Sequence, residues 1–516
     1  MFKILICILS GALQLSAAPP QLKHSDVVFM SSASDPALYK PYGATWVAWG
    51  GTPSRVPQTQ AAGLIATGDL WALTAGARLI HADPALAEAV ARDIEGHPIE
   101  VPWQSDQTYQ GTKTYFGCTN APAFQQHLLQ KTREAVKFKP DGLHLDDPSG
   151  SYAPTDYRGG CYCHYCMDGF RQYLKAHDSA ALRAEAGVKS WDKFDYKALV
   201  QSKAPTAAQC IAQAAQLPLR QAFMAYQLDQ MLANAKRIRD EARHEVVADL
   251  AFSVNAYFST LGSHFLAFTP LVTHFVAEIE HHAEAGTARL WPVVQAYRQG
   301  EAVGRPIAAT ANGEDYAWIK AHNAVNLVKV WIALSYAAGQ RLMVPHPEMQ
   351  WCHTAALGTH WYRAPTAEFA PYYQFVRQHA ALFDEHVTIG PLAVRSALGQ
   401  DWKSPQARAK LAEDLNQVKA PFSANEHVWL FPRQGKDSSL ALHLVNLQYS
   451  AELDLVAPQV HLDVAVPMDW VPAASKTATF YTPGQDPMKL KVVRKNNTVV
   501  VQVPGLDTWG ILEFKP

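Results

Sequence analysis

Short apolar runs that end in polar or aromatic residues recur along the first three quarters of the chain, and helical patterns separate them. This alternation is typical of a parallel α/β fold, and a closed (β/α)8 TIM barrel fits it best. For the third strand, two runs are alternative candidates. The predicted strands are Ala44–Trp49, Trp71–Thr74, Ile99–Trp103 or Thr114–Cys118, Gly142–Asp146, Ala251–Ala256, His274–Ile279, Pro306–Thr310 and Arg341–Pro345.

A long helix is predicted over Phe223–His244, where apolar residues recur with the 3.6-residue period of a stripe packed on a sheet. Residues 148–222 separate it from the fourth strand, far more than the roughly 2 to 6 residues of an ordinary βα connection. We therefore predict an insertion at about 148–222. Insertions on that face of a barrel tend to shape the active site.

After Val387 the pattern changes to short alternating strands with Pro, Gly and Asn between them, which is typical of a β-sandwich. We therefore expect a barrel domain over residues 19–387 and a C-terminal β-sandwich over 388–516. The expected sandwich strands are Leu440–Leu447, Val460–Val466, Thr477–Tyr481, Leu490–Val493 and Thr498–Val503.

The N-terminus has the order of a secretory signal: a charged start at Lys3, an apolar stretch over Ile4–Leu15 and small residues over Ser16–Ala18. The apolar stretch is shorter than the roughly 20 residues of a spanning helix, which argues against a membrane anchor. We expect a signal peptide over residues 1–18 and a secreted or periplasmic protein.

The charge balance and the aromatic content indicate which kinds of molecule the chain can bind. Lys and Arg total 45 against 46 Asp and Glu, and no basic run is present that could follow a phosphate backbone. We therefore expect no nucleic-acid partner. The 14 Trp, 20 Tyr and 20 Phe can build a core and can also stack on sugar rings.

The fourth predicted strand ends in two adjacent carboxylates, Asp146 and Asp147, which a buried parallel strand rarely does for structural reasons. Residues two apart in a strand share a face, so His144 and Asp146 point the same way and Asp147 the other. We predict Asp146 to be catalytic, with His144 and Asp147 binding substrate. The structural alternative is that these aspartates cap the following loop.

A second carboxylate is needed, because glycosidic cleavage uses one group to attack or activate water and another to protonate the leaving oxygen. The sixth strand supplies Glu278 and Glu280, which share one face. We predict one of them to be the acid/base, with Glu280 nearer the rim. The alternative is a pair of solvated surface glutamates. Glu314 is a weaker candidate, since Gly313–Asp315 also fits an ordinary turn.

Other strand ends carry aromatic or polar residues suited to binding sugar rings and hydroxyls. Each tryptophan among them could equally belong to the core. The candidates are Trp49, Trp103, Trp351, Asn255, His346 and Glu348.

Three cysteines, Cys161, Cys163 and Cys166, are too tightly spaced for three separate disulfides but suit thiolates converging on one Zn²⁺. Cys118 is the natural fourth ligand, and His164 is less suited. Four sulfurs leave no open position, so the predicted zinc is structural. Disulfides are the alternative in an exported chain. Cys210 and Cys352 are unassigned, and Cys7 lies in the signal.

The segments Cys118–Phe124 and Cys161–Leu174 resemble the zinc motif of family 42 glycoside hydrolases, which are β-galactosidases. This resemblance implies a zinc site made by the four cysteines. That family ends its fourth strand in Asn-Glu, whereas this chain has His144-Leu145-Asp146-Asp147. This difference argues against β-galactosidase activity, and a family-42-like β-galactosidase is kept as an alternative function on the zinc motif alone.

An Asp at the end of strand four with a carboxylate on strand six is similar instead to retaining α-glycosidase barrels, such as the dextranase-like family 66 and the α-galactosidase clan. Those families also carry a C-terminal β-sandwich. The run Asp141-Gly142-Leu143-His144-Leu145-Asp146-Asp147 with a Cys-rich insertion resembles uncharacterised glycosyl hydrolase barrels. These resemblances imply an oligo- or polysaccharide substrate.

The leading interpretation is a secreted α-glycosidase-like enzyme that retains configuration, with Asp146 as nucleophile and Glu280 or Glu278 as acid/base. An inverting mechanism stays open, and so does an oligomeric assembly. Two other classes remain. One is a metal-dependent sugar deacetylase with His144, Asp146 and Asp147 as ligands. The other is a non-catalytic carbohydrate-binding barrel.

Overall fold

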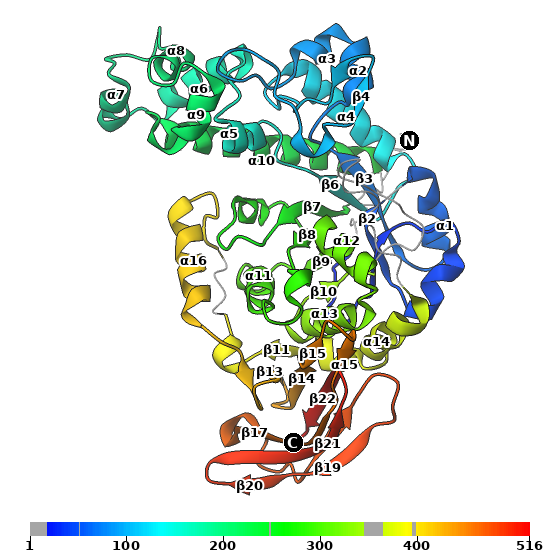
Figure 1. Cartoon of the computed structure of the whole chain (residues 1–516). Coiled ribbons are helices and arrows are strands. Elements are labelled where there is room, and N and C mark those ends of the chain that lie inside the picture. Colours follow the sequence, from blue (N-terminus) through cyan, green and yellow to red (C-terminus); the bar gives the residue numbers. More distant parts are fainter. Residues whose placement is uncertain (1–17, 51, 247–248, 345–364, 395–398) are drawn as a thin grey trace, which may run out of the picture.

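Eight parallel strands form the barrel in the computed structural model, which describes residues 18–50, 52–246, 249–344, 365–394 and 399–516. The sheet closes where Phe29 forms a parallel bridge with Val344 (Figure 1). The predicted TIM-barrel fold is therefore confirmed. In sheet order the strands are β1 (Val28–Ser31), β2 (Trp46–Gly50), β3 (Ile65–Trp71), β6 (Gly142–Asp146), β7 (Ala251–Tyr257), β8 (Phe275–Ile279), β9 (Ile307–Ala311) and β10 (Arg341–Leu342).

Alternate residues of these strands face opposite sides of the barrel wall. Inward-facing side chains such as Trp46, Val276 and Met343 form a small central core, and outward ones such as Leu143 and Phe252 belong to the larger core. Helices connect and cover the strands: α1 (Val56–Ala61), α4 (Pro122–Val136), α10 (Arg220–Val246), α11 (Trp291–Ala302), α12 (Gly313–His322) and α13 (Val325–Ala337).

The first three strands differ from the prediction. β1 was not predicted, because a four-residue run is too short for periodicity to distinguish from a loop. The second predicted strand was placed too late, since β3 already begins at Ile65. Its apolar pattern is hard to recognise because Gly68 and Asp69 interrupt it. Neither candidate for the third strand belongs to the barrel: the two runs pair with each other through Glu100 and Tyr115.

Two long excursions leave the barrel after β3 and after β6 and pack together above it (Figure 1). The backbone N–H of Tyr162 donates to the carbonyl of Arg92 at 2.7 Å, and Gln201 Nε2 donates to the carbonyl of Ile94 at 3.0 Å. The first excursion contains α2 (Ala77–Ala82), α3 (Pro84–Glu88), a short 3-10 helix (Pro102–Gln104), β4 (Thr108–Tyr109) and β5 (Thr112–Lys113). The second contains α5 (Tyr152–Arg158), α6 (His164–Ala176), α7 (Ala180–Ala186), α8 (Tyr196–Gln201) and α9 (Ala207–Ala212).

The C-terminal part forms antiparallel sheets, in agreement with the predicted sandwich. One sheet has the order β11-β13-β14-β22-β18-β19 and the other β17-β21-β20. Leu442 of β14 faces the sandwich core, whereas its neighbour Ala441 belongs to the barrel core, so this strand is buried on both faces. The elements are α14 (Thr366–Gln378), α15 (Ala380–Asp384), β11 (His386–Thr388), α16 (Pro405–Gln417), β12 (Phe422–Ser423), β13 (Val428–Gly435), β14 (Leu440–Asn446), β15 (Tyr449–Ser450), β16 (Leu455–Val456), β17 (Gln459–Pro467), β18 (Thr477–Tyr481), β19 (Met488–Lys491), β20 (Val493–Lys495), β21 (Thr498–Leu506) and β22 (Trp509–Phe514).

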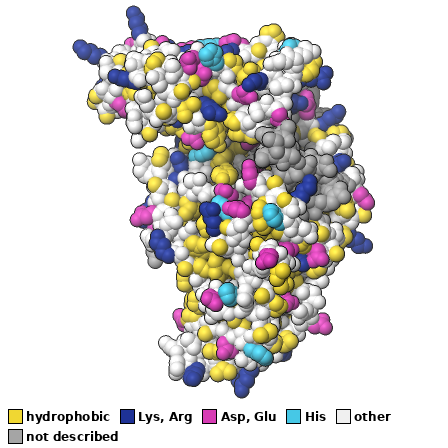
Figure 2. Space-filling model, viewed as in Figure 1, with side chains coloured by type: hydrophobic (Ala, Val, Ile, Leu, Met, Phe, Trp, Pro, Cys, Tyr) yellow, Lys and Arg dark blue, Asp and Glu magenta, His cyan; other side chains and the backbone are white. Residues whose placement is uncertain are grey.

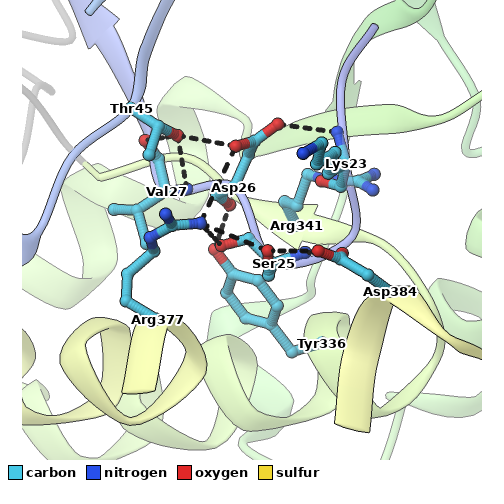
Figure 3. Close-up of polar contacts among 9 residues, drawn as sticks. All are labelled: Lys23, Ser25, Asp26, Val27, Thr45, Tyr336, Arg341, Arg377 and Asp384. Atoms are coloured by element: carbon cyan, nitrogen blue, oxygen red, sulfur yellow. Dashed lines mark hydrogen bonds and ion pairs between the residues drawn. The ribbon is translucent and has the colours of Figure 1, made fainter. Parts of the chain in front are cut away.

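A polar network fastens the segment before β1 to the last elements of the barrel, α13 and β10, and to α15 (Ala380–Asp384), which follows them (Figure 3). Ser25 donates from its backbone N–H and its hydroxyl to the Asp384 carboxylate, both at 2.8 Å. Arg341 Nε donates to the carbonyl of Lys23 at 2.6 Å, and Tyr336 donates to the carbonyl of Asp26 at 2.9 Å. These contacts hold the first strand in place opposite the end that carries the acidic residues.

The predicted export signal falls almost wholly on residues 1–17, which lie outside the described residues. Among the helices that the structure describes, none has both the length and the apolar character needed to cross a membrane.

Candidate active site

A cavity of about 790 Å³ opens at the carboxyl ends of the barrel strands, below the two excursions. On this side the surface is hollowed between the upper layer and the barrel, with hydrophobic side chains in the hollow (Figure 2). Five acidic side chains line the cavity from four separate parts of the chain: Asp69, Asp146, Asp147, Glu278 and Glu314. Active sites of TIM barrels lie at this end of the fold.

Asp146 and Glu278 are joined by one side chain from the strand between them. Asn255, on β7, donates its amide N–H groups to Asp146 Oδ1 at 2.9 Å and to Glu278 Oε1 at 3.3 Å. Trp49 Nε1 also donates to Asp146 Oδ2, at 3.3 Å. Three of the predicted site residues therefore form one hydrogen-bonded group, with Trp49 as a fourth member.

The surroundings of the two carboxyl groups give them different pKa values. Burial raises the pKa of Asp146, but the hydrogen bonds from Asn255 and Trp49 stabilise its ionised form and oppose that rise. Burial, and then the charge of Asp146, raise the pKa of Glu278 to about 7, against one opposing bond from Asn255. At neutral pH, Asp146 is thus the better anion and Glu278 the better proton donor.

Asp147 also faces the cavity, contrary to the strand alternation predicted for it. Its φ of +47° is a left-handed conformation directly after β6, so the alternation of the strand ends there. Its Oδ2 accepts from Trp71 Nε1 at 2.9 Å. Burial, and then the charge on Asp146, hold the pKa of Asp147 well above its ordinary value.

Asp69 was not predicted, yet it lies on β3 beside His144 of β6 and lines the cavity. Burial and the neighbouring Asp146 hold the pKa of Asp69 well above its ordinary value. Gly50, at the end of β2, makes room for it, because a Cβ there would lie 2.8 Å from the Asp69 Cβ. The sequence signal was the parity of Asp69 with Trp71, which was missed because the second predicted strand was placed too late, at Trp71–Thr74.

Two predicted residues do not reach the cavity. His144 is completely buried below it, with its Nδ1 3.0 Å from Ser253 Oγ and its ring 5.2 Å from that of Trp49. Burial lowers the pKa of His144 to about 3, so the ring is neutral. Glu280 follows the end of β8 at Ile279, where the strand alternation no longer applies, and its carboxylate lies 3.4 Å from His282 Nδ1.

Four predicted or unassigned residues have no description in the structure: His346, Glu348, Trp351 and Cys352 lie outside the described residues. Further cavity residues that the sequence did not single out come from strand ends and from the excursions. They include Trp71, Gln104, Tyr157, Thr310 and Tyr316.

The four predicted cysteines come together in a buried cluster between the two excursions, and none of them is in a disulfide. Cys118 Sγ lies 3.4 Å from Cys163 Sγ and 3.5 Å from Cys166 Sγ, and all four sulfur atoms lie within 4.8 Å of one another. A tetrahedron with Zn–S bonds of about 2.3 Å has sulfurs about 3.8 Å apart, so the cluster fits one metal ion.

Amide groups surround this cluster. Asn120 Nδ2 donates to Cys166 Sγ at 3.2 Å, and the buried Gln227 Nε2 donates to the same sulfur at 3.4 Å. N–H donors aimed at sulfur stabilise a thiolate, which is the form that binds metal. The remaining group of potential metal ligands among the described residues is the trio Asp93, Glu95 and His97, of which Glu95 and His97 are exposed.

Comparison with known proteins relates the chain to two curated sequences, while no protein-family model matches it. It is 22% identical over 513 residues to an α-agarase of Alteromonas agarilytica, covering 82% of this chain and 35% of that protein. It is 20% identical over 324 residues to an α-agarase of Thalassotalea agarivorans, covering 61% of this chain and 21% of that protein. The chain thus spans about a third or less of the length of these relatives.

Solved structures share its fold. An α-L-fucosidase of Paenibacillus thiaminolyticus covers 96% of this chain and 100% of its own, with a TM-score of 0.55 and 10% identity. A cycloisomaltooligosaccharide glucanotransferase of Paenibacillus covers 90% of this chain and 75% of its own, with a TM-score of 0.54 and 9% identity. At such low identity the likeness establishes a barrel followed by C-terminal β-sheets, as predicted.

The raised pKa of Glu278 predicts a pH-dependent gain in stability for Glu278→Gln. The folded protein favours the neutral carboxyl, and this contribution, complete below the ordinary pKa of 4.5, is lost as the pH rises to about 7. Glutamine stays neutral, so the variant should gain on the order of 3 kcal/mol over wild type between pH 4.5 and 8. Denaturant unfolding at both pH values measures the difference.

The matched control is Glu280→Gln, which removes a half-exposed carboxylate outside the cavity. Its stability relative to wild type should change little over the same pH range. An equal gain in both variants, or none in Glu278→Gln, would contradict the assignment of Glu278 as the buried neutral acid.

Proposed function

We propose that the protein is a glycoside hydrolase that cleaves α-linked sugars of an agar-type polysaccharide, with Asp146 as nucleophile and Glu278 as general acid/base. The observation that carries the proposal is the Asn255 amide, which holds both carboxyl groups at one end of the barrel. The sequence likeness to two α-agarases supports the substrate class.

The two carboxyl groups have complementary tasks in this reaction. The ionised Asp146 attacks the anomeric carbon as Glu278 gives its proton to the departing glycosidic oxygen. This forms a sugar ester on Asp146. Glu278, now ionised, takes a proton from water, and the resulting hydroxide attacks the anomeric carbon and releases Asp146. Glu278 is protonated again, so the cycle closes without another reagent.

A retaining course is inferred from the single amide nitrogen that bridges the two groups. Retaining enzymes hold their carboxyl groups about 5 to 5.5 Å apart, whereas inverting enzymes leave about 6.5 to 9.5 Å for a water molecule. One amide nitrogen contacts an oxygen of each carboxyl here, which favours the shorter separation.

The contacts of His144 argue against the deacetylase alternative. Among the described residues, Asp146, Asp147 and His144 belong to no group whose ligand atoms converge within 4.8 Å. The imidazole lies below the cavity and pairs with Ser253. The Asp at the end of strand four likewise favours the α-glycosidase-like interpretation over a family-42-like β-galactosidase.

We also propose that the four-cysteine cluster holds a structural Zn²⁺. Cys118, Cys161, Cys163 and Cys166 would use all four positions of a tetrahedral ion, which leaves none for substrate. Cys118 follows the first excursion and the other three belong to the second, so the metal would cross-link the two.

Three substitutions test the catalytic assignment on agarose. Asp146→Ala should abolish hydrolysis, and Glu278→Gln should lower kcat by about 10² to 10⁴-fold, the usual contribution of a general acid. Glu280→Gln, outside the cavity, should keep near wild-type turnover. Reducing-sugar release from agarose measures all three, with dextran and galactan as comparison substrates. Azide should restore part of the activity of Asp146→Ala only.

Wild-type turnover in Asp146→Ala or Glu278→Gln would refute the catalytic pair. Hydrolysis of dextran or galactan but not of agarose would refute the agar-type substrate while leaving the pair intact.

The zinc proposal predicts about one zinc per chain by elemental analysis of the purified protein. Cys163→Ser should lose the metal and lower the melting temperature by several degrees, because a closed thiolate site contributes to folding. Cys210→Ser is the matched control, since Cys210 is also buried but lies outside the cluster. Zinc-free wild-type protein, or a disulfide involving Cys161 or Cys163, would refute the site.

A further inference from the structure

One wall of the cavity comes from the two excursions and not from the barrel. Trp103 and Gln104 come from the first excursion, and Tyr157 comes from α5 in the second. All three line the same cavity as the carboxyl groups, yet none takes part in the hydrogen bonds that hold Asp146 and Glu278.

The aromatic rings of this wall form a fixed and accessible surface. Trp103 packs edge-on against the fully buried Phe116, with centroids 5.8 Å apart, and against Tyr157 at 6.2 Å. Tyr157 nevertheless remains 55% exposed. A large aromatic ring held in place beside a cavity and left open to water is suited to stacking on the apolar face of a sugar ring.

Gln104 adds an unused polar group beside these rings. Its side chain is 6% exposed, and its Oε1 atom has no hydrogen-bond partner among the described residues. A buried acceptor without a partner costs about 1 to 3 kcal/mol, which a ligand hydroxyl would relieve. A terminal amide can accept through its oxygen and donate through its nitrogen, so Gln104 offers both kinds of hydrogen bond.

We propose that Trp103, Gln104 and Tyr157 form a second sugar-binding subsite, which holds a ring of the polysaccharide other than the one whose bond is broken. The proposal rests on the proposed function for the nature of the chain that is bound. An aromatic stacking surface beside an amide oxygen without a hydrogen-bond partner is suited to a pyranose ring, which has an apolar face and hydroxyl groups along its edge.

The cysteine cluster is close in sequence to both halves of this subsite. Cys118 follows Phe116, the ring that supports Trp103, by two residues, and Cys161 follows Tyr157 by four. A metal ion on the cluster would therefore cross-link the two excursions within a few residues of both rings, which meet at a centroid distance of 6.2 Å. The chain gains a rigid platform where two loops would otherwise move independently.

Calorimetric binding of agarose oligosaccharides of two, four and six sugars tests the subsite. The Asp146→Ala protein, in which hydrolysis should be abolished, serves as the parent, so that the ligands are not cleaved. Adding Trp103→Ala or Tyr157→Ala should weaken hexasaccharide binding about tenfold, equivalent to about 1.4 kcal/mol, and leave disaccharide binding nearly unchanged. Tyr157→Phe keeps the ring and should bind like the parent.

Tyr109→Ala is the matched control, because Tyr109 belongs to the same excursion but lies outside the cavity lining. Hexasaccharide binding that is equal in the parent and in both alanine variants would overturn the subsite. So would a parent that binds no oligosaccharide. Binding does not need the reaction, so failure of the catalytic assignment would appear separately, as unchanged turnover in Glu278→Gln.

Discussion

The Asn255 amide nitrogen contacts an oxygen of Asp146 and an oxygen of Glu278, and the proposed chemistry depends on this contact. Without it, Asp146 would keep only the Trp49 hydrogen bond and Glu278 would lose its one opposing bond, so burial and mutual repulsion would raise both pKa values further. The amide stabilises the anion of Asp146 together with Trp49, while Glu278 receives a single longer bond. Unequal hydrogen bonding therefore assigns the charge to one group and the proton to the other.

The barrel and the excursions together position and cover the groups that make this contact. The parallel barrel brings β6, β7 and β8 side by side, so residues far apart in sequence meet at one end. The polar network around Asp26 and Arg341 fastens the opposite end of the barrel, where the first strand must meet the last. The excursions then cover the carboxyl groups, which lowers their exposure to water and strengthens each electrostatic interaction in the cavity.

Much of this arrangement was predictable from the sequence, because acidic and polar residues stand where the apolar runs of the predicted strands end. The alternation of β6 identified Asp146, and that of β8 brought Glu278 into consideration together with Glu280. Alternation could not choose between the two glutamates, since the choice depends on β8 ending at Ile279. It also failed at Asp147, whose left-handed backbone reverses the expected direction.

Asp69 shows a second limit of prediction from hydrophobic periodicity. A glycine and a charged residue in the middle of β3 weaken its apolar pattern, while the runs at 99–103 and 114–118 are apolar because they pack within an excursion. The second predicted strand was therefore placed too late, at Trp71–Thr74, and Asp69 was missed. Periodicity reports burial and not which sheet a run joins, so a run of the excursion was taken as the third strand. The cysteine spacing was more informative, because ligand geometry restricts it directly.

The pH dependence of kcat/KM for agarose hydrolysis tests the central claim most directly, since it reports the acid and base of the free enzyme. With Glu278 as the proton donor and a pKa of about 7, the rate should fall about tenfold per pH unit above neutrality, as the carboxyl loses its proton. A rate that stays level to pH 9 would contradict a protonated Glu278 as the general acid.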